Sequence, residues 1–166
     1  MVRFTARGAA GAAPPAVDPQ AVLALLRVTL GTLFIWVFFE NLGKGLYTPQ
    51  GYAGLIAVYV DRGRAPDAWK TVMTVMANQA AIAAPMQAVA EFSFGALLLL
   101  GLLTRPVAFA AFLFLTTLWI SEWGTAWIWE LLVPMIVALG LALGAAGRKL
   151  GLDGLLARRY PGVPLW

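Results

Sequence analysis

The residues best suited to chemistry begin at the end of the first long apolar run. Trp36, Glu40 and Lys44 follow one another at intervals of four residues, and Asn41 lies directly beside them. Residues four apart lie on the same face of a helix, so an indole, a carboxylate and an ammonium group would form one stripe. The stripe is either the wet end of a membrane helix or one wall of a site, and the spacing alone leaves both interpretations open.

Two further carboxylates interrupt later apolar runs. Glu91 is the only charged residue within 86–103, and Glu130 is the only one within 126–146. A charge in a membrane-spanning helix is costly unless it is paired or faces a polar cavity. We therefore expect each of these carboxylates to be paired or to serve a function.

The surroundings of Glu91 predict which way it points. Ala88, Glu91 and Gly95 share one helix face, and small residues on a face indicate close contact between membrane helices. Glu91 should therefore point into the helix bundle. There we expect Lys44 or Asn41 to partner it.

Tryptophans are expected at the same level as these carboxylates. Tryptophan at helix ends most often forms an interfacial belt, and Glu40 and Glu122 at helix ends are more often solvated than functional. The candidate outer site, for a quinone headgroup or a partner subunit, comprises Trp36, Glu40, Asn41, Lys44, Glu91, Trp119, Trp123 and Glu130.

Two arginines are candidates for contacts at the other end of the bundle. Arg27 interrupts the first apolar run, and Arg105 lies in the short link between the second and third. A long cationic side chain in such a place usually snorkels to lipid phosphates. The alternative for Arg27 is to bind an anionic head group or a partner subunit. We regard both arginines as candidate lipid-phosphate or partner contacts.

The residue types that the chain lacks exclude several kinds of site. It contains no Cys and no His, which excludes disulfides, thiolate nucleophiles, Cys-ligated iron–sulfur clusters and Cys/His zinc sites. No metal site is predicted and no catalytic residue is assigned. The basic residues behind the net charge of +4 are scattered, which argues against a nucleic-acid partner.

Composition and hydropathy predict an all-α integral membrane protein. Of the 166 residues, 61% are hydrophobic and 12% are charged, whereas soluble domains carry roughly 25% charged residues. A spanning helix needs about 20 apolar residues. We therefore predict a four-transmembrane-helix bundle in a membrane domain over 20–147, and its spans are about 20–40, 86–103, 106–123 and 126–146.

The long first connection, residues 41–85, is predicted to be helical. Thr48 followed by Pro49 is typical of a helix start, and Pro66 can start a second helix. The second helix has an apolar face that includes Trp69 and Met73. This face either lies in the membrane interface or packs onto the bundle as a cap.

The distribution of Lys and Arg predicts that both ends of the chain are cytoplasmic. The N-in/C-in orientation makes residues 1–19 a flexible cytoplasmic tail and residues 148–166 a basic cytoplasmic tail. It leaves 41–85 outside, although that connection carries four basic residues. The predicted location is the inner (plasma) membrane, as a multi-pass protein of bacterial or archaeal type.

Three stretches of the chain resemble the DoxX/DoxD-like membrane proteins. The resemblance rests on LRVTLGTLFIWVFFENLGKG, AEFSFGALLLLGLLTRPVAF and GAAGRKLGLDGLLARRYP, and it covers about residues 22–160. It implies a four-helix membrane fold. DoxD is the membrane subunit associated with thiosulfate:quinone oxidoreductase, which passes electrons from thiosulfate to a membrane quinone.

Two functions compete on this basis. We favour an accessory or scaffold subunit of a larger redox-linked membrane complex, because the chain has no means of holding its own metal or haem. The alternative is a quinone-interacting membrane subunit of an oxidoreductase such as thiosulfate:quinone oxidoreductase. A third possible function is a small transporter or lipid-handling protein, but the sequence contains no internal repeat that would support it. Whether the chain is an enzyme is left open.

The two leading functions share their expected partners but differ in whether a cavity lies beside Glu91. Membrane lipids and other membrane-protein subunits are the expected partners in both. No cofactor held by protein side chains is expected, and a quinone or a structural lipid is the ligand left open. A cavity beside Glu91 that opens to lipid would favour quinone binding, whereas side chains filling that volume would favour a scaffold.

Overall fold

The structure, a computed structural model, describes residues 18–163 and residue 165. Within this part of the chain it contains helices and no strand. The helices are α1 (Pro19–Gly43), α2 (Pro49–Arg62), α3 (Asp67–Asn78), α4 (Ala80–Leu100), α5 (Thr104–Ser121), α6 (Ile128–Gly144) and α7 (Leu152–Arg159). The flexible tail predicted for residues 1–19 lies outside the described residues, except for Asp18 and Pro19.

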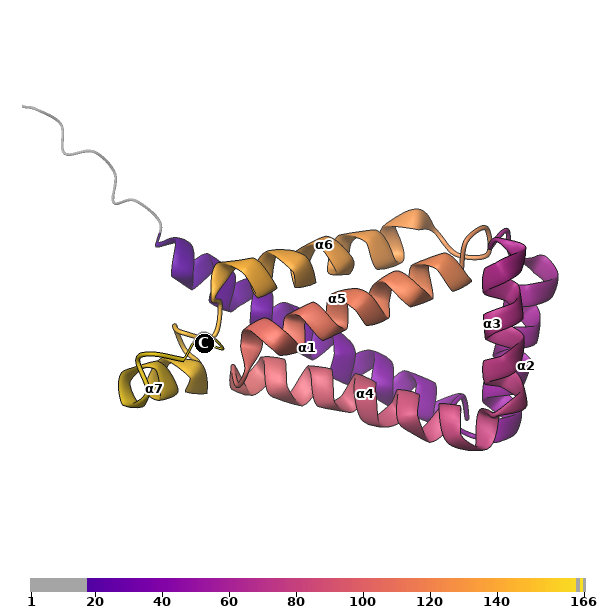
Figure 1. The fold of residues 1–166 in the computed structure, drawn as a ribbon, viewed down its shortest axis with the longest axis horizontal. Helices are drawn as coiled ribbons and strands as arrows, with labels where there is room; N and C mark the ends of the chain where they lie inside the picture. The colour runs from indigo at the N-terminus through magenta and orange to yellow at the C-terminus, as the bar shows by residue number, and fades with distance from the viewer. Residues whose placement is uncertain (1–17, 164, 166) are drawn as a thin grey trace, which may run out of the picture.

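Four of the helices run alongside one another, and the other three lie at the ends of this bundle. Helix α1 packs mainly on α4, and α5 packs mainly on α6. The two pairs lie close together at the α7 end and spread apart toward the other end, where α2 and α3 cross the bundle (Figure 1). The chain enters α1 and leaves α7 at the same end of the molecule.

Close contact between α1 and α4 depends on two glycines. A Cβ atom added at Gly31 would lie 3.0 Å from Leu99 Cγ and 3.1 Å from the carbonyl oxygen of Gly95. A Cβ added at Gly95 would lie 2.7 Å from Ile35 Cδ1. The small-residue face predicted for the second span therefore does mark a helix–helix contact, as such faces do in membrane bundles.

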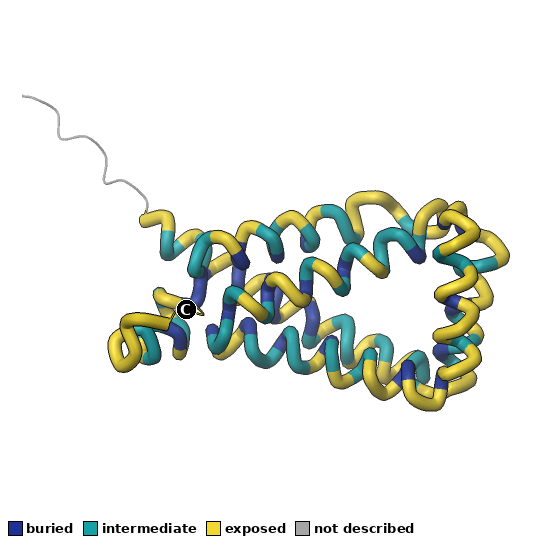
Figure 2. Tube along the Cα trace, viewed as in Figure 1, coloured by how far each residue is buried: buried dark blue, intermediate teal, exposed yellow. Residues whose placement is uncertain are grey.

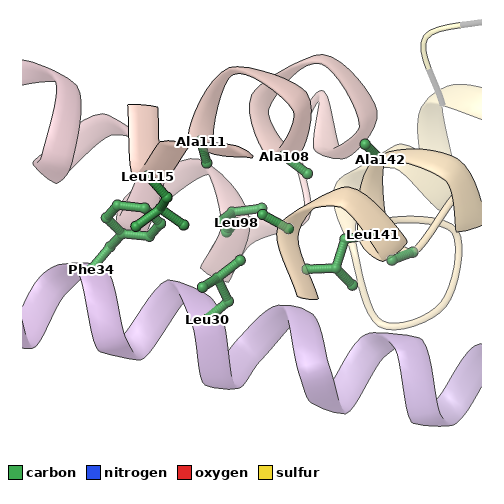
Figure 3. Close-up of a cluster of buried hydrophobic side chains, with 10 residues drawn as sticks. Leu30, Phe34, Leu98, Ala108, Ala111, Leu115, Leu141 and Ala142 are labelled. Carbon is green, nitrogen blue, oxygen red and sulfur yellow. The ribbon is translucent and has the colours of Figure 1, made fainter. Parts of the chain in front are cut away.

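The hydrophobic core lies where the four helices converge. Figure 3 shows Leu30 and Phe34 of α1 meeting Leu98 of α4, Leu115 of α5 and Leu141 of α6. Buried positions on these helices gather on the sides that face one another, and the outer sides are exposed (Figure 2). The core thus occupies one half of the bundle and leaves the spread end to other residues.

The exposed outer faces are apolar, as a lipid-facing surface requires. Large side chains such as Leu25, Val89 and Leu143 are 66%, 67% and 73% exposed. Helices α1, α4 and α5 are long and apolar enough to cross a membrane, whereas α6, with 17 residues, is apolar but shorter. The all-helical membrane fold is therefore supported, while the fourth span and the N-in/C-in orientation stay predictions.

The first connection contains two helices, as predicted. Thr48 caps α2, because its Oγ1 accepts a hydrogen bond from the Gly51 amide at 3.1 Å. Helix α3 begins directly after Pro66. The indole of Trp69 donates to Ser121 Oγ at 2.9 Å, which ties α3 to the end of α5. The structure therefore favours the interpretation that α3 packs onto the end of the bundle, rather than lying as a separate helix in the membrane interface.

Helix α4 begins at Ala80, earlier than the start at residue 86 that hydropathy predicts. Its first turns are built from small residues, and Ala80, Ala83 and Ala84 are buried against Tyr52 and Ile56 of α2. Packing of these alanines extends the helix past Pro85, which lies inside it. This apolar, alanine-rich segment is therefore the first part of α4, although the sequence analysis did not include it in the span.

The C-terminal segment, predicted as a basic tail, is partly ordered in a helix. Asp153 in the first turn of α7 is 1% exposed. Its carboxylate accepts hydrogen bonds from the amides of Leu103 and Thr104, at 2.7 and 2.8 Å. These amides begin α5, where an acidic side chain is favourable. Asp153 therefore docks α7 onto the α4–α5 turn.

Candidate functional site

A cavity of about 750 Å³ lies between the spread end of the bundle and the crossing helices α2 and α3. Most of its lining is apolar. The polar side chains in the lining are Glu40, Asn41, Lys44, Tyr52, Tyr59, Trp69, Gln87, Glu91, Thr117, Ser121, Glu122 and Glu130. The chain contains four glutamates, and every one of them lines this cavity.

Glu91 is buried beside the cavity and accepts hydrogen bonds from three neutral side chains. It is 2% exposed. Its Oε1 accepts from Gln87 Nε2 at 2.7 Å, and its Oε2 accepts from Asn41 Nδ2 at 3.1 Å and from the Tyr47 hydroxyl. The inward orientation of Glu91 and its contact with Asn41 agree with the prediction from the sequence.

Lys44 does not partner Glu91, although the sequence allowed it. Its ammonium group lies 2.5 Å from Glu40 Oε1, one helical turn earlier, and both side chains are about half exposed. Two of the three residues in the predicted stripe, Glu40 and Lys44, therefore pair with each other. A local pair of this kind forms more readily than a contact with Glu91, since the two side chains already share a helix face.

The sequence analysis missed two residues of this cluster, Gln87, which lies one turn before Glu91 on α4, and Tyr47. Tyr47 lies in the turn between α1 and α2, where no helical periodicity marks it. Its ring stacks on Phe38 at 5.4 Å between centroids, which directs the hydroxyl to Glu91. Burial, together with the hydrogen bond to Glu91, raises the pKa of Tyr47, so this hydroxyl keeps its proton and acts as a donor.

A second carboxylate cluster lies where α2 meets the α5–α6 end. Tyr59 donates to Glu122 Oε1 at 2.8 Å. Burial raises the pKa of Glu122, and the neighbouring Glu130 raises it further, whereas the hydrogen bond from Tyr59 lowers it. The sequence analysis regarded Glu122 as a solvated helix end, but the crossing helix α2 covers it and makes it part of the cavity wall.

The tryptophans of the candidate site lie outside this cavity. Trp36 is 71% exposed on the outer surface of α1. Trp119 and Trp123 stack on each other, with centroids 5.6 Å apart. They line a neighbouring pocket of about 230 Å³ together with Trp127 and Arg64, and Glu122 belongs to the lining of both this pocket and the cavity. The structure therefore brings Glu40, Asn41, Lys44, Glu91 and Glu130 to one cavity and leaves Trp36, Trp119 and Trp123 out of it.

Arg27 is buried at the opposite end of the bundle and does not snorkel. Its side chain is 0% exposed. The guanidinium donates to the carbonyl oxygens of Leu98 at 2.5 Å, Leu99 at 3.1 Å and Leu150 at 2.7 Å. These contacts correct the expectation that Arg27 reaches lipid phosphates, because the end of α4 and the segment before α7 enclose it.

Arg105 also contacts a backbone carbonyl at this end. Its Nε donates to Ala142 of α6 at 3.2 Å. This bond links the start of α5 to the end of α6. Whether Arg105 also contacts a lipid or a partner subunit stays a prediction.

Comparison with known proteins identifies one family. A family model described as DoxX matches residues 22–123, which run from the first turn of α1 to just past the end of α5. No curated protein and no solved structure matches the chain. The matched region contains three of the four glutamates that line the cavity, while Glu130 lies just beyond it.

Proposed function

Because the chain belongs to the DoxX family, we propose that this membrane protein binds the headgroup of an isoprenoid quinone in the cavity that α2 and α3 close. The protein would do so as a subunit of a larger membrane complex. Binding the headgroup at the spread end of the bundle leaves the apolar tail to run between the helices or into lipid.

The cavity is the observation that supports this proposal. A scaffold would fill the space beside Glu91 with side chains, whereas a volume of about 750 Å³ stays unfilled. Sites for small molecules usually measure roughly 300–1,000 Å³ and combine apolar walls with a few polar groups. Leu33 and Met86 line the cavity and are 42% and 64% exposed.

Polar groups for a headgroup are available on the cavity wall. Tyr52 belongs to the lining, and its hydroxyl makes no hydrogen bond to any other part of the described chain. It could donate to a quinone carbonyl. Glu91 on α4 could take a proton when the bound headgroup is the reduced quinol, since Tyr47 and Asn41 already hold its carboxylate in place.

The role as a subunit of a larger complex is inferred from the lack of Cys and His side chains. Without Cys or His, this chain offers no side-chain set for an iron–sulfur cluster or a bis-His haem. A partner protein would therefore supply electrons to the quinone or accept electrons from the quinol. Thiosulfate:quinone oxidoreductase is one such complex, and the accessory role favoured from the sequence is compatible with quinone binding in it.

A pair of substitutions on α4 tests the cavity directly. Ala90 lines it, whereas Val89, its neighbour, is 67% exposed on the outer surface. Ala90→Phe would fill part of the space, and Val89→Phe adds the same ring outside. After purification from quinone-containing membranes in mild detergent, the retained quinone is extracted and quantified by chromatography.

We expect the unmodified protein and Val89→Phe to retain quinone. Ala90→Phe should retain about tenfold less quinone, which corresponds to a loss of about 1.4 kcal/mol of binding free energy. Equal retention by both variants would place the quinone elsewhere. An unmodified protein that retains none, and binds none when a short-tailed quinone is added, would contradict the proposal. Partner subunits are identified from the same preparations.

A further inference from the structure

We propose that this cavity binds the reduced, hydroxyl-bearing quinol more tightly than the quinone. The inference rests on the proposed function and concerns which form of the headgroup the same cavity selects. A quinone presents two carbonyl oxygens, which only accept hydrogen bonds, whereas a quinol presents two hydroxyl groups, which can donate them.

The charges on the cavity wall favour a ligand that donates. All four glutamates of the chain line the cavity, and the only cationic side chain in the lining is Lys44. Lys44 is already paired with Glu40. The described residues provide no cation for Glu91, Glu122 or Glu130 within ion-pair distance.

Most hydrogen-bond donors of the wall are already used within the protein. Asn41, Tyr47 and Gln87 donate to Glu91. The hydroxyl groups of Thr117 and Ser121 donate to helix carbonyls at 2.7 and 2.8 Å.

Two further donors are also used, since Tyr59 donates to Glu122 and Trp69 donates to Ser121. The donors of the wall left in the described chain are the Tyr52 hydroxyl, the second N–H of each of the Asn41 and Gln87 amides, and the remaining ammonium protons of Lys44. A ligand that can only accept would therefore depend on neutral donors and on a lysine that is already paired with Glu40.

Acceptor positions are more plentiful. A carboxylate offers about four lone-pair sites. Glu91 uses three of them, two on Oε2 and one on Oε1. Glu122 uses Oε1 for Tyr59. A hydroxyl that donates to a carboxylate forms a charge-assisted bond, roughly twice as strong as a neutral one, whereas a carbonyl in the same position would face another acceptor.

Three ligands of matched shape test this selection. A short-tailed quinol, its quinone and the dimethyl ether of the quinol share the same ring and tail, but only the quinol can donate. Their dissociation constants are measured with the purified full chain in lipid nanodiscs, with the quinol kept reduced under anaerobic conditions. We expect the quinol to bind about tenfold more tightly than the other two, as a net gain near 1.4 kcal/mol for a charge-assisted bond implies.

Substitutions identify the groups that select the ligand. Glu91→Gln and Glu122→Gln keep the shape of the side chain but remove its charge, so each should narrow the ratio between quinol and quinone to about threefold, because the assisted bond becomes a neutral one. Asp61→Asn removes an exposed carboxylate of α2 that does not line the cavity. This control should leave the ratio unchanged.

The outcomes separate the two proposals. If none of the three ligands binds, quinone binding itself is wrong. If the quinone binds as tightly as the quinol, the cavity binds quinones but the selection proposed here is wrong. A dimethyl ether that matches the quinol, or a ratio that neither Gln variant changes, would also overturn it. A lipophilic ammonium compound that displaces the quinol at lower concentration would show that the carboxylates select a cation instead.

Discussion

At the scale of single residues, the carboxylates of this protein differ in what surrounds them. Glu40 is about half exposed and paired with a lysine, whereas Glu91 is buried and surrounded by neutral donors. Glu122 lies between these cases, beside Tyr59 and under α2. Since a buried carboxylate without a cation resists ionisation, Glu122 should make the stability of the protein depend on pH.

The expected dependence has a definite sign. Because burial raises the pKa of Glu122 above its ordinary value of 4.5, the folded state holds this proton more tightly than the unfolded state. Stability should therefore fall as the pH rises from about 4.5 through the raised pKa. Glu122→Gln should flatten that part of the profile, and Asp61→Asn should leave it as it is. Thermal unfolding in detergent from pH 4 to 8 measures the effect, and an unchanged profile in Glu122→Gln would contradict it.

At the scale of elements, the buried arginine connects three segments that are distant in sequence. Arg27 of α1 donates to the last turn of α4 and to the segment between α6 and α7. A guanidinium can reach several carbonyls at once because its donors form a rigid fork, and a lysine ammonium cannot reproduce that geometry. Arg27 therefore acts as a structural clamp at the end of the bundle opposite the cavity.

Arg27→Lys should destabilise the protein strongly. Hydrogen bonds from charged groups contribute about 1.5–3 kcal/mol each, and we expect the loss of at least one of them to lower the melting temperature by several degrees. Arg62→Lys, on the exposed end of α2, provides the matched control and should be silent. Melting curves followed by circular dichroism measure both. Equal melting temperatures for the two variants would mean that Arg27 snorkels after all.

At the scale of the whole molecule, the cavity and the clamp lie at opposite ends of one bundle. The chain enters α1 at the clamp end, where Lys149 also pairs with Asp18. Figure 1 shows α7 at that end and α2 and α3 at the other. If the clamp end is cytoplasmic, as the Lys and Arg distribution predicts, the cavity lies in the outer half of the membrane.

Single cysteines test this orientation, because the chain has none of its own. Ala68 on α3 and Arg158 on α7 are both exposed. In intact cells, a membrane-impermeant thiol reagent should label Ala68→Cys and should label Arg158→Cys only after the cells are broken. Labelling of Arg158→Cys alone in intact cells would reverse the orientation and put the cavity on the cytoplasmic side.

The sequence by itself determined helices α1 to α6, but not α7, and it determined the inward direction of Glu91. Apolar runs, the Thr48–Pro49 start and the small residues around Glu91 are local signals, and local signals suffice for elements and for the faces they present. The structure agrees at these points: Thr48 caps α2, and Glu91 is buried. The same signals missed the first turns of α4, whose alanines are helical because α2 packs on them.

Only the tertiary structure decided which residues meet. Tyr47 lies 44 residues from Glu91 in the chain, and no periodicity relates positions so far apart. The sequence left Lys44 and Asn41 open as partners of Glu91, and the packing of the helices selects Asn41. Hydropathy placed Glu122 at a wet helix end, but α2 crosses over it. Arg27 was expected to reach lipid, but the end of α4 and residue Leu150 enclose it. Each of these contacts depends on how whole helices pack, and packing is set by the summed shape of many side chains, which no single stretch of sequence records.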